Sequence, residues 1–237
     1  MISKARSLGR ALVRRVAGPS ELPAHARISY AQEGEDLILC RMFEPDFPSA
    51  GFYVDIGAHH PSRFSTTRIF YDQGWRGLNV DARPGSMADF RDDRPRDINV
   101  EAAVAGKRGE MIYYMFNEPA LNSFDSTLSA ERDGLRSYRI IDQITVPVLP
   151  LAELLEEHLP VSQQIDFLTV DVEGLDADVL GSNDWSRFRP RFVLAEIPSP
   201  WLKDLSDSAV GTILLKAGYN IRACTTSTCF FEVQDHS

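Results

Sequence analysis

One short stretch constrains the fold of this chain more than any other. An apolar run over residues 52–54 ends in Asp55, and Gly57 follows. A second apolar run, residues 77–80, ends in Asp81. Buried parallel strands are continuous apolar runs, and a glycine after a strand lets the backbone turn tightly and approach a ligand. The pattern is typical of a strand–helix–strand unit that holds a nucleoside at the carboxyl ends of its strands.

The kind of nucleotide follows from what surrounds Gly57. A dinucleotide site needs the pattern G-x-G-x-x-G, whose glycines let a pyrophosphate rest on a helix N-terminus, but residues 58–61 are Ala-His-His-Pro. Asp55 would repel a pyrophosphate, whereas it suits a cationic ligand such as the ammonium group of S-adenosylmethionine. Asp81 is placed to accept both hydroxyls of a ribose.

The rest of the chain alternates between strand-like and helix-like segments. Strands are predicted over residues 52–55, 78–81, 98–104, 110–116, 146–149, 165–171 and 192–197, and helices over 30–43, 65–73, 86–91, 151–158 and 206–217, the last capped by Ser206. Residues 117–145 have no clear period, which is typical of a functional or mobile insertion. The alternation predicts a doubly wound, mostly parallel α/β sheet, closed by an antiparallel C-terminal hairpin of residues 219–223 and 229–233.

The first 26 residues differ from the rest in charge. They carry a basic run and no acid before Glu21, the basic residues being Lys4, Arg6, Arg10, Arg14 and Arg15. We expect a poorly packed leader, helical or mobile, with weak peripheral contact to an anionic membrane surface as the alternative. Residues 27–237 are predicted to form a single domain with an insertion at about 110–150.

Composition narrows the function classes. The net charge of −9 disfavours a nucleic-acid binder, and no secretory or transmembrane segment is visible in the sequence. The three cysteines, Cys40, Cys224 and Cys229, have no metal-type spacing, so we expect free thiols in a cytoplasmic protein. A disulfide between Cys224 and Cys229, which flank a predicted turn, is the alternative.

Acids recur where the predicted strands end. Asp55, Asp81, Asp171 and Glu196 each end one, and Glu173 lies two residues beyond Asp171. Carboxyl ends of strands line the ligand crevice of open α/β sheets, and residues two apart on an extended segment point the same way. Close carboxylates need a counter-charge or raised pKa values. A divalent cation such as Mg²⁺ on Asp171, Glu173 and Glu196 would supply the charge, and so would the cations of the cofactor with nearby arginines.

Two histidines, His59 and His60, follow Gly57 at the mouth of this crevice. Either one would suit a general base that deprotonates an acceptor hydroxyl. The alternative for each is a hydrogen-bonded loop histidine.

Taken together, the motifs resemble the FkbM-type S-adenosylmethionine-dependent methyltransferases over about residues 28–200. The matching segments, in the family's order, are residues 29–36, 53–61, 65–67, 74–77 and 166–174, and within residues 117–145 only the tripeptide Asn122-Ser123-Phe124 is family-like. The resemblance implies a class I, Rossmann-like methyltransferase fold and methyl transfer to a hydroxyl, with several relatives acting on sugars or polyketides. One departure is that relatives usually carry Glu-Pro at the end of the second strand, where this chain has Asp81-Ala82-Arg83-Pro84.

These lines of argument give the predicted site. The cofactor-binding residues are Asp55, Gly57 and Ala58 at the methionine portion, Asp81 and Ala82 at the ribose, Ala102 and Ala103 at the adenine, and Asp171. By resemblance alone, Gln32 and Glu35 cover the cofactor. The acceptor side is Asp171, Glu173 and Glu196, and the acceptor is a sugar or glycan-type hydroxyl. The alternatives are a non-catalytic nucleoside- or sugar-binding relic of the fold and a nicotinamide-dependent oxidoreductase.

Overall fold

The computed structural model describes residues 23, 25–44, 47–197 and 205–234, so the basic side chains of the predicted leader lie outside the described residues. Its main sheet has seven strands in the order β3-β2-β1-β7-β8-β10-β9. The strands are β1 (Phe52–Ile56), β2 (Arg76–Asp81), β3 (Ile98–Glu101), β7 (Phe167–Val170), β8 (Phe192–Glu196), β9 (Tyr219–Cys224) and β10 (Thr228–Val233). The first five run parallel, and β10 is antiparallel to both neighbours. This order confirms the predicted class I methyltransferase fold.

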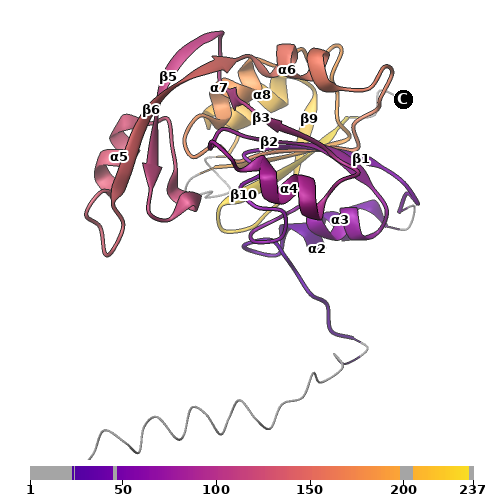
Figure 1. Cartoon of the computed structure of the whole chain (residues 1–237). Helices are drawn as coiled ribbons and strands as arrows, with labels where there is room; N and C mark the ends of the chain where they lie inside the picture. The colour runs from indigo at the N-terminus through magenta and orange to yellow at the C-terminus, as the bar shows by residue number, and fades with distance from the viewer. Residues whose placement is uncertain (1–22, 24, 45–46, 198–204, 235–237) are drawn as a thin grey trace, which may run out of the picture.

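Helices cover both faces of this sheet (Figure 1). One face packs against α2 (Glu35–Phe43) and α3 (Arg68–Asp72), with α4 (Met87–Asp93) beside them; the other packs against α6 (Leu151–His158), α7 (Asp176–Gly181) and α8 (Ala209–Lys216). Alternate strand residues serve the two faces: Tyr53 joins an aromatic cluster with α2 and α3, while Val54 packs with α6 to α8. No helix in the described part of the chain is long and apolar enough to cross a membrane.

The segment predicted as an insertion builds a second sheet. Its three strands, in the order β4-β6-β5, are β4 (Ala103–Val104), β5 (Gly109–Phe116) and β6 (Ile140–Leu149), and between β5 and β6 lie the 3₁₀ helix η1 (Pro119–Leu121) and α5 (Ser126–Arg132). In Figure 1 the long β5–β6 pair and α5 extend to one side of the main sheet. The prediction of a four-residue strand at 146–149 was too short, because all but one residue of β6 is exposed or only partly buried and the strand shows no continuous apolar run.

The predicted strand over 98–104 is in fact two strands in two sheets. The backbone N–H of Ala102 donates to Asp81 O at 3.1 Å, and after it the chain leaves β2 and pairs through Ala103 with Val148 of β6. No glycine or proline marks this transfer.

Several helix ends also differ from their predictions. The helix predicted from Tyr30 begins at Glu35, because Gly34 precedes it in the left-handed region at φ 87°. Ser208, rather than Ser206, caps α8, since its side chain accepts from Gly211 N. The short helix α7 had no prediction.

Cys224 and Cys229 form a disulfide, so the expectation of free thiols was wrong for this pair. The two residues face each other across the antiparallel β9–β10 pair with Cα atoms 4.2 Å apart, a spacing just below the usual disulfide range. Cys40 is a free thiol, and burial raises its pKa to about 12.

Candidate active site

Two adjoining cavities open at the carboxyl ends of β1, β2, β7 and β8. Five residues line both of them: Gln32, Gly57, Phe64, Asp171 and Glu173. The first cavity extends over β2 toward η1 and β5, and the second extends over β8 toward the turn of the C-terminal hairpin. The predicted crevice is therefore present, and it has two compartments that meet at the ends of β1 and β7.

Gly57 makes this junction sterically feasible. Its φ of 88° lies in the left-handed region, and a Cβ at this position would stand 1.8 Å from the carbonyl oxygen of Asp171. Its N–H donates to Val80 O at 2.9 Å. A residue with a side chain would therefore push β1 and β7 apart at the point where the cavities meet.

Asp81 is the polar centre of the first cavity. Its Oδ2 accepts from the backbone N–H of His59 at 3.0 Å, and its Oδ1 accepts from that of Arg83 at 2.8 Å. Each carboxylate oxygen keeps acceptor capacity for a further partner. The sequence signalled the acid, but it did not reveal that the backbone of Arg83, a residue without a predicted role, orients it.

The predicted adenine residues divide between cavity and core. Ala82 and Ala102 line the first cavity. Ala103 lines neither cavity, because it points the other way along the extended chain and packs against Ala105 and Val148.

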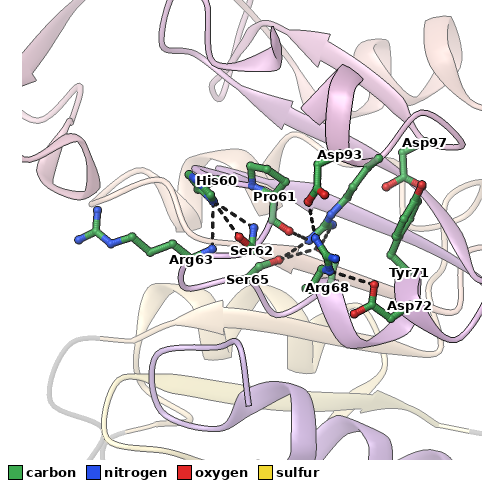
Figure 2. A network of polar contacts seen from close by, with 12 residues as sticks. His60, Pro61, Ser62, Arg63, Ser65, Arg68, Tyr71, Asp72, Asp93 and Asp97 are labelled. Carbon is green, nitrogen blue, oxygen red and sulfur yellow. Dashed lines mark hydrogen bonds and ion pairs between the residues drawn. The ribbon is translucent and has the colours of Figure 1, made fainter. Parts of the chain in front are cut away.

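The two candidate base histidines lie in different environments. His59 lines the first cavity, its Nε2 is buried without a hydrogen-bond partner among the described residues, and burial lowers its pKa. His60 lines neither cavity, and its Nδ1 accepts from the backbone N–H groups of Ser62 and Arg63 at 3.1 and 3.0 Å (Figure 2). His60 is therefore a hydrogen-bonded loop histidine, as the alternative interpretation had it. His59 lines the first cavity, together with Asp81, and does not line the second.

The second cavity is rich in carboxylates. Those that line it are Glu33, Glu35, Asp55, Asp171, Glu173 and Glu196. Glu33 and Glu35 are fixed by the C-terminal hairpin: Ser227 N–H donates to Glu33 Oε2 at 3.0 Å, and Thr228 Oγ1 donates to Glu35 Oε1 at 3.5 Å. A hydrogen bond from Thr225 is the main cause that lowers the pKa of Glu33.

The remaining acids have raised pKa values. Burial raises the pKa of Asp55 to about 6, against a hydrogen bond from Thr67 that lowers it. Burial, followed by the charges of Glu173 and Glu196, raises the pKa of Asp171 well above its ordinary value. Asp171 is open to solvent through the cavities, while protein atoms surround it on its other sides. A carboxyl group of this kind titrates closer to neutral pH, where it can both accept and return a proton.

Glu173 is held by the insertion, which the sequence did not predict. Its side chain pairs with Arg132 of α5 at 2.7 Å, with both side chains 22% exposed. Its carbonyl oxygen accepts from Ser123 Oγ at 2.7 Å, and its φ of 52° is unusual for a residue with a side chain. Burial nonetheless raises the pKa of Glu173, against the lowering charge of Arg132.

The Mg²⁺ site on Asp171, Glu173 and Glu196, one of the two alternatives for the counter-charge, is not supported. Among the residues that the structure describes, no group of three or more His, Cys, Asp or Glu side chains is arranged to hold a metal ion. The counter-charge that the sequence argument required stands beside Glu173 as Arg132. We therefore derive no step through Mg²⁺.

Several cavity residues had no prediction. The first cavity is also lined by Tyr113, Asn122 and Phe124, and the second by Thr66, Ser227 and Thr228. Asn122 and Phe124 lie in a tripeptide that resembles the methyltransferase family, which was the available signal. Arg132 lies in a polar segment with no period, and nothing in the sequence marks it.

Comparison with known proteins identifies the family of the chain. A model of the Methyltransferase FkbM domain matches residues 55–221. Among solved structures, a TehB-like SAM-dependent methyltransferase from Corynebacterium glutamicum is 11% identical, with a TM-score of 0.41 over 98% of this chain and 97% of that chain. Fibrillarin from Aeropyrum pernix, in complex with S-adenosyl-L-methionine, is 14% identical, with a TM-score of 0.39 over 90% and 85% of the two chains. Because these scores are low, the fold assignment rests on strand order. No curated protein sequence matches the chain.

Proposed function

The chain belongs to the FkbM methyltransferase family, whose domain model matches residues 55–221, and on that premise we propose that it transfers a methyl group from S-adenosylmethionine to a hydroxyl of a sugar or glycan-type acceptor. The family resemblance of the sequence motifs is thereby confirmed. The observation that carries the proposal is that Asp171 and Glu173 line both cavities, so a donor whose nucleoside lies in the first cavity and an acceptor in the second would meet beside them.

In this proposal the nucleoside occupies the first cavity. Asp81 accepts hydrogen bonds from the ribose hydroxyls, and its geometry is prepared by the N–H groups of His59 and Arg83. Ile56, Val80 and Ala102 supply apolar contact for the base. The methionine portion crosses Gly57 and brings its ammonium group to Asp55 in the second cavity.

Asp171 is the proposed proton acceptor. The acceptor oxygen attacks the sulfonium methyl in line, the carbon–sulfur bond breaks as the carbon–oxygen bond forms, and the hydroxyl proton passes to Asp171. The products are the methyl ether and S-adenosylhomocysteine. Orientation and exclusion of water supply most of the remaining acceleration.

A polyhydroxylated acceptor suits the second cavity because its walls are rich in hydrogen-bonding groups. Carboxylates from four segments of the chain and the hydroxyls of Thr66 and Thr228 line it. Sugar hydroxyls can donate to such carboxylates, and the more acceptors the cavity provides, the better it fixes one hydroxyl toward the methyl group.

The test begins with calorimetric titration of the protein with S-adenosylhomocysteine, with NADH as the comparison ligand. We expect binding of S-adenosylhomocysteine alone, followed by methyl transfer to one member of a panel of sugar acceptors. Cofactor binding with no transfer to any acceptor would favour the non-catalytic relic. Binding of NADH instead would overturn the proposal.

A further inference from the structure

Arg94 is a buried cation without a direct carboxylate partner. The residue follows α4, is 0% exposed, and within the described residues makes no ion pair; its guanidinium lies near the rings of Tyr71 and Phe90. A buried guanidinium stays charged, so it needs a compensating negative charge close by.

The guanidinium is instead bound to neutral oxygens in the loop between β1 and α3. Its Nη1 donates to Thr67 Oγ1 at 2.7 Å, and its Nη2 donates to Ser65 Oγ at 2.7 Å and to the carbonyl of Pro61. Figure 2 shows Pro61 and Ser65 reached by these bonds.

Thr67 connects Arg94 to the second cavity through two hydrogen bonds. Its hydroxyl donates to Asp55 Oδ2 at 2.9 Å, and because a hydroxyl has one proton, it must accept from Arg94. Thr67 precedes α3, yet its side chain makes no cap hydrogen bond with that helix. Its hydroxyl therefore links Arg94 to Asp55 and has no capping role.

We propose that Thr67 and Arg94 are positioning residues that orient Asp55 and keep it ionised for the ammonium group of the cofactor. This inference rests on the proposed function. The charged groups that face Asp55 come from several elements: Asp81 at the end of β2, Asp97 before β3, Asp171 after β7 and Glu35 on α2 are acids, and Arg94 is the cation. Without the hydrogen bond from Thr67, only the charge of Arg94 opposes the effect of these acids and of burial on Asp55.

The experiment is titration with S-adenosylhomocysteine as a function of pH, for the wild type and for Thr67→Val. Valine is nearly isosteric with threonine but lacks the hydroxyl. The wild-type affinity should fall as the pH drops through about 6. In Thr67→Val this midpoint should move to higher pH, and the affinity at pH 7.5 should weaken by about ten-fold or more, since a hydrogen bond to a buried charge is lost. Thr67→Ser, which keeps the hydroxyl, should restore both values.

Two further variants separate positioning from stability. Ser65→Ala removes a hydroxyl that lies 2.7 Å from Arg94 Nη2 and 3.3 Å from Thr67 Oγ1 but leaves the hydrogen bond from Thr67 to Asp55, so its pH midpoint should lie much closer to that of the wild type than the midpoint of Thr67→Val does. In an Asp55→Asn background, Thr67→Val should have little further effect on affinity. If Thr67→Val folds poorly, Arg94→Lys tests the same link, with an expected upward shift of the midpoint.

An unchanged midpoint and affinity in Thr67→Val would overturn this inference and leave the methyltransferase proposal intact. Absence of S-adenosylhomocysteine binding by the wild type would instead overturn the proposed function.

Discussion

The two cavities are assembled from different parts of the chain. In the first, Asp81 is oriented by backbone N–H groups of its own strand–helix–strand unit, His59 and Arg83. In the second, Glu173 is held by Arg132 from the insertion. Glu33 is held by Ser227 of the hairpin turn, which is 194 residues away from it in sequence. In the proposed function, the donor side is thus formed by contacts within one short segment, and the acceptor side depends on contacts between distant segments. Substitutions should therefore affect donor and acceptor separately, except where the cavities meet.

The largest effect is expected at that junction. Gly57→Ala would place a Cβ within 1.8 Å of Asp171 O, in addition to a backbone strain of about 1–3 kcal/mol at positive φ. We expect a strongly destabilised protein that no longer binds S-adenosylhomocysteine, measured by chemical unfolding and calorimetry. Gly85→Ala is the matched control, since Gly85 also has a positive φ of 78° but no atom within 4 Å of the added Cβ. Equal losses in both variants would show that backbone strain, rather than the junction, is responsible.

The next effect isolates the chemical step. Asp171→Asn should reduce turnover by about 10²–10⁴-fold, the usual contribution of a positioned base, while the affinity for S-adenosylhomocysteine changes much less. The wild-type rate should fall in acid, because the raised pKa of Asp171 leaves the carboxyl protonated there. Normal turnover by Asp171→Asn would remove Asp171 from the mechanism and return His59 to consideration.

Stability supplies an independent check on the same variant. The pKa of Asp171 is higher in the folded protein than the ordinary 3.8, so the folded state binds the proton more tightly. Ionisation of Asp171 therefore opposes folding, and the wild type should lose stability as the pH rises from about 3.8 to the raised pKa of the folded state. Asp171→Asn should flatten this dependence of the free energy of unfolding, whereas a steeper dependence would contradict the raised pKa.

The difference between the cavities also explains what the sequence could predict. Asp55, Gly57 and Asp81 stand at strand ends within one short unit, so apolar runs and a glycine were enough to find them. The division of residues 98–104 between two sheets was missed, because it follows from pairing with β6 rather than from a local break. The role of His60 was left open, since only the loop geometry shows that its Nδ1 is occupied.

A smaller effect is expected from the contact between the insertion and the acceptor side. Arg132→Met should raise the acceptor KM or lower turnover by roughly 10–100-fold, since Glu173 loses its partner and its fixed position. The affinity for S-adenosylhomocysteine should change little. Arg139→Met is the matched control, because the Arg139 side chain bonds to the neighbouring carbonyl of Tyr138. If Arg132→Met weakens binding of S-adenosylhomocysteine as much as it weakens binding of the acceptor, substitutions on the acceptor side do not act separately from the donor side.

The smallest effect tests whether the hairpin needs its disulfide to hold the acceptor side. The β9–β10 pair is already joined by its strand ladder, and the bridge between Cys224 and Cys229 closes a loop of only a few residues. In the chain-entropy model so short a loop contributes about 2 kcal/mol to the free energy of unfolding. The double variant Cys224→Ser, Cys229→Ser should lose about this much in urea unfolding and keep its affinity for S-adenosylhomocysteine. Its acceptor KM should rise only slightly, because Ser227 can still donate to Glu33 from the turn. A large rise in acceptor KM would mean that the bridge, more than the strand ladder, positions the turn, and the acceptor side would then respond to the redox state of its surroundings.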